Sequence, residues 1–152
     1  MAGGREIAVA NRQRTRRLDR KAIVRFCEWI AADLEHCELG VHFVSAKEMA
    51  RVHAQFMNIA GSTDVITFDH GSEPPRKVHG ELFISVEDAI EQAREFRTTW
   101  PEEIARYLIH GVLHLLGFDD LQPKARAEMK RRENLLMKRA GKVFDFAMFE
   151  KR

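Results

Sequence analysis

The sequence predicts one domain of the α+β class, and three observations lead to this prediction. The chain has 152 residues, an ordinary length for one domain with one core. Hydrophobic residues make up 45% of the chain and charged residues 32%, which is typical of a globular protein and excludes a disordered one. Four segments have strand patterns, and helical patterns separate the early ones. We therefore expect four strands and about five helices in a single α+β or mixed α/β domain over residues 1–152.

A strand, a helix and a second strand are expected first. Residues 6–11 alternate weakly between apolar and polar side chains, which indicates a strand. Asp19 then precedes a helical stripe of apolar residues from Ile23 to Leu34, and its carboxylate suits an N-cap. Residues 39–44 alternate again, with β-branched and aromatic side chains, and predict the second strand.

A short helix and two more strands are expected in the middle of the chain. Ser45 and Glu48 have the spacing of a capping box, which predicts a helix of about three turns. Residues 64–68 and 79–85 have strand patterns. A loop rich in glycine and proline, at 71–75, separates these two strands.

Three helices complete the pattern. Ser85 can cap a helix that follows it directly, and Thr99 with Glu102 forms a second capping box that opens the next helix. Pro123 suits the first turn of a last helix, which should end near Gly141.

The helix opened by the second capping box carries His110 and His114 among apolar residues and glycine. Residues four apart share one helix face, so both imidazoles can bind one ion. Gly117 predicts a left-handed helix end that turns the chain back and lets Asp119 or Asp120 supply a third ligand. Three protein ligands with a fourth position open are typical of catalytic zinc. The alternative is a pair of core histidines before an ordinary glycine C-cap.

Gly111 follows the first histidine directly, and this excludes one kind of metalloenzyme site. Zincin proteases have a glutamate at this position, which serves as the general base. Glycine has no side chain that can take a proton. The proton acceptor must therefore come from elsewhere or be the metal-bound water itself.

Three segments of the chain resemble one known family. Residues 110–119 match the signature H-G-x-L-H-L-x-G-[YF]-D-H of the YbeY-like endoribonucleases, or rRNA maturation factors, up to its last position. Residues 62–68, Ser-Thr-Asp-Val-Ile-Thr-Phe, are similar to the family's T-[DN]-V-[LI]-[ST]-F strand. Residues 80–85, Gly-Glu-Leu-Phe-Ile-Ser, are similar to its G-[DE]-[IL]-x-I-S strand. The three segments stand in the family's order, so the resemblance covers most of the chain.

The resemblance implies a fold, an activity and a setting. The fold would be a four-stranded mixed sheet covered by helices, with a metal site at the end of a buried helix. The activity would be that of a zinc-dependent single-strand endoribonuclease in 16S rRNA maturation and ribosome quality control. His110, His114 and Asp120 would hold one Zn²⁺ per chain and carry the catalysis. The partners would be rRNA and the small ribosomal subunit.

Two departures from the family pattern stand out. The family's usual third ligand is histidine, and this chain has Asp120 there. A carboxylate is an acceptable zinc ligand and lowers the net charge of the site by one relative to a neutral imidazole. Many relatives also have an arginine in the loop before the T-[DN]-V strand, whereas the corresponding residues 57–61 contain none.

Other polar residues are weaker candidates for the site. Asp119 either is the third ligand or orients an imidazole. Thr63 and Asp64 stand at a strand start, where such side chains often only complete a turn, and Glu81 lies on the strand 79–85. We treat these three as candidate cleft residues. Four other histidines have no pair spacing and are expected to be structural or exposed: His42, His53, His70 and His79. His70 and His79 flank the 71–75 loop, so either can approach the metal.

Basic residues gather in two places, although the formal net charge is only +2. One cluster lies near the N-terminus and includes Arg14, Arg16 and Arg17, and the other runs from Lys124 to Arg139. Either can contact RNA phosphates, and the alternative is a solvated loop and a solvated helix face. The two cysteines form no CxxC pair, which fits a reducing cytoplasm, and no apolar run of 18 residues predicts a membrane span.

Two other functions remain open at this point. In a non-catalytic ribosome-assembly factor the metal would mainly hold the fold, and the missing loop arginine favours that alternative. A metallopeptidase has similar histidine spacing, but Gly111 argues against it.

Overall fold

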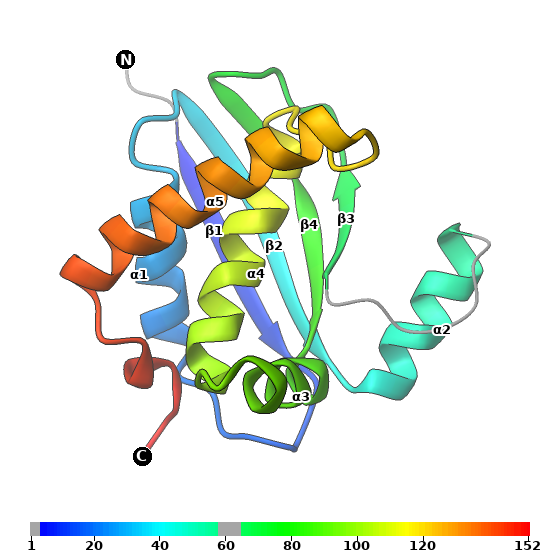
Figure 1. Ribbon diagram of the computed structural model, residues 1–152, viewed down its shortest axis with the longest axis vertical. Coiled ribbons are helices and arrows are strands. Elements are labelled where there is room, and N and C mark those ends of the chain that lie inside the picture. Colours follow the sequence, from blue (N-terminus) through cyan, green and yellow to red (C-terminus); the bar gives the residue numbers. More distant parts are fainter. Residues whose placement is uncertain (1–3, 58–64) are drawn as a thin grey trace.

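The computed structural model describes residues 4–57 and 65–152, and it confirms an α+β domain with a four-stranded mixed sheet (Figure 1). The elements in chain order are β1 (Arg5–Asn11), α1 (Arg20–Ile30), β2 (His36–Val44), α2 (Ala46–Met57), β3 (Val65–Asp69), β4 (Lys77–Ser85), α3 (Val86–Phe96), α4 (Trp100–Leu115), α5 (Pro123–Val143) and a short 3-10 helix, η1 (Phe146–Phe149).

The strands lie in the order β1-β2-β4-β3. β1 pairs with β2 and β2 with β4 in parallel, while β3 pairs with β4 in the antiparallel direction. Val41 in the middle of β2 lies opposite Val9 on one side and Leu82 on the other. The three parallel strands are therefore in register, and β3 forms one edge of the sheet.

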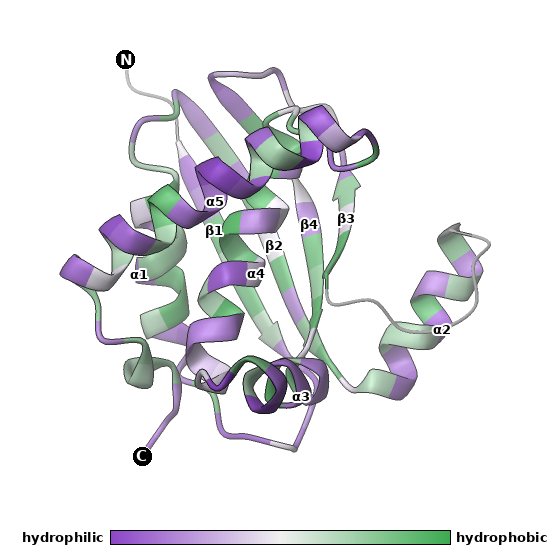
Figure 2. Cartoon of the chain, viewed as in Figure 1, coloured by the Kyte–Doolittle hydropathy of each residue, from purple (hydrophilic) through white to green (hydrophobic). Residues whose placement is uncertain are grey.

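One face of the sheet packs against α4, the most deeply buried helix. Leu39, Val41 and Leu82 are almost fully buried on this face. The helix lies unusually close to the sheet at Gly111, where an added Cβ atom would lie 2.6 Å from the Leu82 side chain. α5 crosses over α4 and is hydrophilic along much of its length (Figures 1 and 2). This places α4 as the middle layer between the sheet and α5.

The opposite face of the sheet is only partly covered. Alternation along β4 sends Glu81 and Phe83 to the side away from Leu82. A small second cluster of apolar residues (Val44, Met49, Val52 and Ile66) lies where α2 joins this side. Beyond that cluster α2 extends away from the sheet (Figure 1).

The four N-caps expected from the sequence are confirmed. Asp19 accepts a hydrogen bond from the Ala22 amide, and three hydroxyl groups do the same for the amide three residues later: Ser45 for Glu48, Ser85 for Asp88 and Thr99 for Glu102. Each cap satisfies one of the amide groups that a helix start leaves without a partner.

Three boundaries differ from expectation. α1 ends at Ile30 although its apolar stripe continues to Leu34, because the chain turns after Ala31 and brings Leu34 back to the core. β2 begins at His36 rather than at residue 39, and β4 begins at Lys77 rather than at residue 79. Apolar periodicity records which side chains are buried, and a turn can bury a side chain as well as a helix can. Among the helices that the structure describes, none is long and apolar enough to cross a membrane.

Candidate metal centre

His110 and His114 lie one turn apart near the C-terminal end of α4, on the side that faces α5. Their Nε2 atoms are 3.1 Å apart, and each side chain is about 30% exposed, at 30% and 28%. Burial and the neighbouring His110 lower the pKa of His114 from its usual value, in spite of the nearby Asp120. A neutral imidazole has a free lone pair, so His114 is suited to bind a metal ion.

The end of α4 turns the chain back towards these histidines. Gly117 has a φ of +92°, as the sequence predicts, and its amide donates to the His114 carbonyl while the Phe118 amide donates to the Leu113 carbonyl. This pair of hydrogen bonds is a Schellman motif, which needs a left-handed residue at the glycine position. The loop that follows brings Asp120 Oδ2 to 3.7 Å from His110 Nε2 and 3.6 Å from His114 Nε2.

The three atoms fit a zinc-type ion. Zinc ligands at 2.0–2.2 Å in a tetrahedral arrangement lie roughly 3.3–3.6 Å from one another, and the observed separations are 3.1, 3.6 and 3.7 Å. In residues 4–57 and 65–152, no other three His, Cys, Asp or Glu side chains bring their ligand atoms as close together. Two imidazoles and one carboxylate would leave a fourth position for water or substrate.

The carboxylate of Asp119 has different contacts from that of Asp120. Its Oδ1 accepts a hydrogen bond from the Leu121 amide at 2.9 Å and so closes the local turn. Arg126 Nε donates to the Asp120 carbonyl at 3.0 Å and ties the same loop to α5. Of the two aspartates that the sequence offers as the third ligand, the structure therefore brings Asp120 to the histidines.

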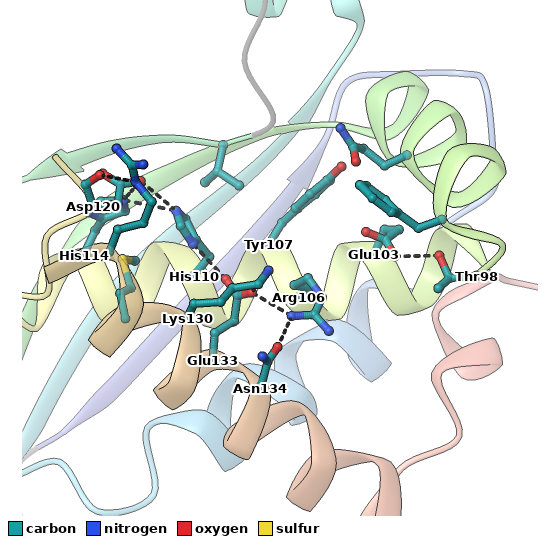
Figure 3. Close-up of a pocket in the computed structure, with 15 residues that line it drawn as sticks. Thr98, Glu103, Arg106, Tyr107, His110, His114, Asp120, Lys130, Glu133 and Asn134 are labelled. Atoms are coloured by element: carbon teal, nitrogen blue, oxygen red, sulfur yellow. Dashed lines mark hydrogen bonds and ion pairs between the residues drawn. The ribbon is translucent and has the colours of Figure 1, made fainter. Parts of the chain in front are cut away.

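Glu133 on α5 contacts the outer side of the His110 ring and was missed by the sequence analysis. His110 Nδ1 lies 2.8 Å from Glu133 Oε1, while Arg106 and Lys130 donate to Oε2 at 2.7 and 3.1 Å (Figure 3). Burial alone would raise the pKa of this carboxyl, but the hydrogen bonds from His110 and Arg106 and the charge of Lys130 lower it to about 2. A signal was present in the sequence, because Glu133 stands between Met129 and Met137 on the buried stripe of α5.

The candidate ligands lie at one end of a cavity of about 710 Å³ that follows α4 (Figure 3). Three cationic side chains line it: Arg106, Arg126 and Lys130. Phe96 also lines it and is 61% exposed. Glu103, which lies near the far end, is buried and accepts a hydrogen bond from the Thr98 hydroxyl at 2.6 Å. The cavity thus combines three cationic side chains, three carboxylates (Glu103, Asp120 and Glu133) and an exposed aromatic ring.

Glu81 lies on the face of the sheet away from α4, so the structure does not bring it to this cavity. Its two carboxylate oxygens bind His70 and His42 at 2.7 and 2.8 Å, and these hydrogen bonds lower the pKa of Glu81. His79 pairs with Glu38 at 2.7 Å. His70 and His79 therefore pair with glutamates of the sheet and do not approach the candidate ligands.

The remaining candidates lie far from the ligands or outside the described residues. Arg17 accepts a backbone hydrogen bond from Lys151, near the end of the molecule where α4 begins, and Arg14 and Arg16 are in the same loop. Along α4, at about 1.5 Å per residue, that end is about 21 Å from His114. Thr63 and Asp64, and residues 58–61 of the loop without arginine, fall outside the residues that the structure describes.

A family model and several curated proteins match this chain, and they share one description. Residues 7–141 match the family model described as Endoribonuclease YbeY. Curated proteins named Endoribonuclease YbeY are similar to this chain in Rhodopirellula baltica (40% identity over 116 residues, 73% of this chain and 59% of that protein) and Protochlamydia amoebophila (36% over 109 residues, 70% and 73%). The one from Alkaliphilus metalliredigens is 28% identical over 149 residues, 90% of this chain and 96% of that protein. The chain thus spans about three fifths of the first relative and nearly all of the last. The solution structure of TM1509 from Thermotoga maritima has a similar fold, with a TM-score of 0.65, 27% identity and 87% of each chain covered.

Proposed function

Because the chain belongs to the Endoribonuclease YbeY family, we propose that it is a zinc-dependent endonuclease that cleaves single-stranded RNA. Family membership supports a nuclease activity, that is, hydrolysis of phosphodiester bonds. We further propose that its substrate is 16S rRNA during maturation and ribosome quality control, with the small ribosomal subunit as partner.

One observation carries the proposal. Three ligand atoms, from His110, His114 and Asp120, converge at separations that suit zinc, and they do so inside a cavity rather than in a sealed core. A purely structural zinc site takes four protein ligands, whereas a catalytic one keeps a position open. This favours catalysis over the alternative of an assembly factor in which a metal only holds the fold.

Different residues of the chain would hold the metal ion and bind the substrate. His110, His114 and Asp120 would hold the ion, which when bound lowers the pKa of its water to about 7 and polarises a phosphoryl oxygen. Arg106, Arg126 and Lys130 would attract the phosphates of the substrate into the cavity.

Phe96 offers a surface on which an unpaired base can stack. Stacking of this kind tolerates any base and requires single-stranded RNA, because a base inside a duplex already stacks on its neighbours.

The packing at Gly111 argues against peptide hydrolysis by the zincin mechanism. That mechanism needs a glutamate directly after the first histidine. An added Cβ atom at Gly111 would lie 2.6 Å from Leu82, so the sheet leaves no room for any side chain there. The position that would hold the general base of a peptidase is therefore closed by the fold.

The two cysteines are consistent with the proposed cytoplasmic location. Cys27 and Cys37 are both free and buried, and burial raises the pKa of each thiol. Thiols of this kind are inert packing residues and need no oxidising compartment.

The test is RNA cleavage by the purified chain. We expect it to cut unstructured RNA, to stop after chelation and to recover when zinc is added. The cleavage rate of His114→Ala should be at least 100-fold lower than that of the wild type. His79→Ala, which replaces a histidine on the other face of the sheet, should cleave at the wild-type rate. A zinc-loaded wild-type chain that leaves single-stranded RNA intact would contradict the proposal and favour the assembly factor.

A further inference from the structure

We propose that Glu133 is a positioning residue of the metal centre: it keeps the His110 proton on Nδ1 and thereby directs the Nε2 lone pair at the ion. The inference rests on the proposed metal-dependent function. It adds a residue from α5 to a site whose candidate ligands all belong to α4 and the loop after it.

The contact has the geometry of a strong hydrogen bond. His110 Nδ1 and Glu133 Oε1 are 2.8 Å apart, and the other ring nitrogen, Nε2, faces His114 and Asp120. A carboxylate can only accept a hydrogen bond, so the nitrogen facing Glu133 must carry the proton. The nitrogen facing the candidate ligands is then unprotonated, as metal binding requires.

Core packing alone does not explain why Glu133, a carboxylate, is buried. Its side chain is only 4% exposed, and it occupies a place on α5 where the neighbouring stripe positions are methionines. A buried carboxylate costs several kcal/mol unless it is paired and hydrogen-bonded, and an apolar residue would fill the same place without that cost. The buried carboxylate of Glu133 is explained if its function is to orient the His110 ring.

Two cations hold Glu133 in place. Arg106 Nη1 donates to Glu133 Oε2 at 2.7 Å and to Asn134 Oδ1 at 2.9 Å, and Lys130 Nζ donates to the same Oε2 at 3.1 Å. One carboxylate oxygen is thus held by cations, and the other is left for the imidazole. Because these cations offset the negative charge, Glu133 can orient His110 without making the whole site more anionic.

The two candidate histidine ligands are supported in different ways. The His114 ring lies beside the backbone of Phe118, a neutral group in the loop after α4. His110 has a carboxylate at its other ring nitrogen, Nδ1, in addition to Asp120 near Nε2. A carboxylate behind an imidazole ligand makes it more basic and fixes its orientation. Removing Glu133 should therefore change the state of His110 more than that of His114.

Histidine ¹⁵N chemical shifts of the metal-free full-length chain test the tautomer directly. We expect Nδ1–H at His110 in the wild type and a shift towards Nε2–H in Glu133→Met, which has a similar volume and no acceptor oxygen. Glu133→Gln keeps one acceptor oxygen and should retain more of the Nδ1–H form. The His114 signals should change less than the His110 signals, although the two Nε2 atoms are only 3.1 Å apart.

Zinc affinity, measured by competition with a chelator, tests the consequence. Loss of a carboxylate behind a histidine ligand typically costs about 10–100-fold in metal affinity, so Glu133→Met should lose this much and Glu133→Gln less. The absorption spectrum of the cobalt-loaded chain should change in parallel. Glu103→Gln is the matched control, because Glu103 is a buried carboxylate on α4 that pairs with Thr98 and should affect folding stability without affecting zinc affinity.

The outcomes separate this inference from the proposed function. If Glu133→Met folds and binds zinc as tightly as the wild type, with His110 in the same tautomer, the inference is wrong and the metal site stands. If zinc affinity falls equally in Glu103→Gln, the loss reflects stability and the inference is again wrong. A wild-type chain that binds no zinc would overturn the proposed function itself.

Discussion

Asp119 and Asp120 are neighbours in the chain, yet their carboxylates have different surroundings. Asp119 closes a turn by accepting from the Leu121 amide, while Asp120 Oδ2 lies within 3.7 Å of both histidine Nε2 atoms. The family signature has histidine where this chain has Asp120. An ion held by one carboxylate and two imidazoles carries one positive charge less than an ion held by three imidazoles, so it should be a weaker Lewis acid.

Metal analysis of aspartate variants tests these roles at the scale of single residues. We expect about one zinc per wild-type chain, most of it lost in Asp120→Ala and most of it retained in Asp119→Ala. Asp120→His should keep the metal, because an imidazole is also a zinc ligand. Equal zinc loss from both alanine variants would show that metal binding depends on the loop as a whole rather than on one carboxylate.

At the scale of elements, the C-terminal end of α4 connects helix geometry to the site. The helix places the two histidines, and the Schellman motif at Gly117 decides where the next residues go. The third ligand therefore depends on a backbone conformation three residues earlier. This makes Gly117 important for metal binding although it contacts no ligand.

Gly117→Ala tests this dependence. A left-handed conformation costs a residue with a side chain about 1–2 kcal/mol, so the variant should lose this much in free energy of unfolding and should also bind zinc more weakly. Gly141→Ala is the control. Gly141 lies in α5 with open space around it, and alanine there should gain up to about 0.5–1 kcal/mol. Chemical denaturation and zinc competition provide the two measurements, and unchanged zinc affinity in Gly117→Ala would refute the link.

At the scale of the whole molecule, two groups of cations lie at different distances from the candidate metal site. Arg106, Arg126 and Lys130 line the cavity beside the candidate ligands. The loop with Arg14, Arg16 and Arg17 lies near the end of the molecule where α4 begins, about 21 Å from His114 along the helix axis. We propose that this loop contacts only those RNA molecules that are long enough to extend beyond the cavity.

RNA length should therefore separate the two groups. Replacing Arg14, Arg16 and Arg17 by Gln should weaken the binding of a long single-stranded RNA. The slope of log affinity against log salt concentration should become shallower by about 0.7 for each phosphate that the variant no longer binds. A short oligonucleotide that fills only the cavity should bind as it does to the wild type. Titrations at several salt concentrations measure both, and an equal weakening for short and long RNA would contradict this arrangement.

Local patterns in the sequence were enough to predict most of the elements and two of the candidate ligands. Asp19, Ser45, Ser85 and Thr99 cap the helices that their spacing predicts, because a capping side chain acts within one turn. His110 and His114 share a face because the helix repeat requires it. These features depend on residues at most four positions apart, so the sequence by itself determined them.

Only the tertiary structure decided which distant residues meet. It paired Glu133 with His110 across 23 positions in sequence, selected Asp120 over Asp119, and placed Glu81 on the face of the sheet away from the cavity. Each of these results depends on how α5 and β4 pack against α4 and on one left-handed turn. Packing of separate elements follows from the shape of the whole core, which no short stretch of sequence contains.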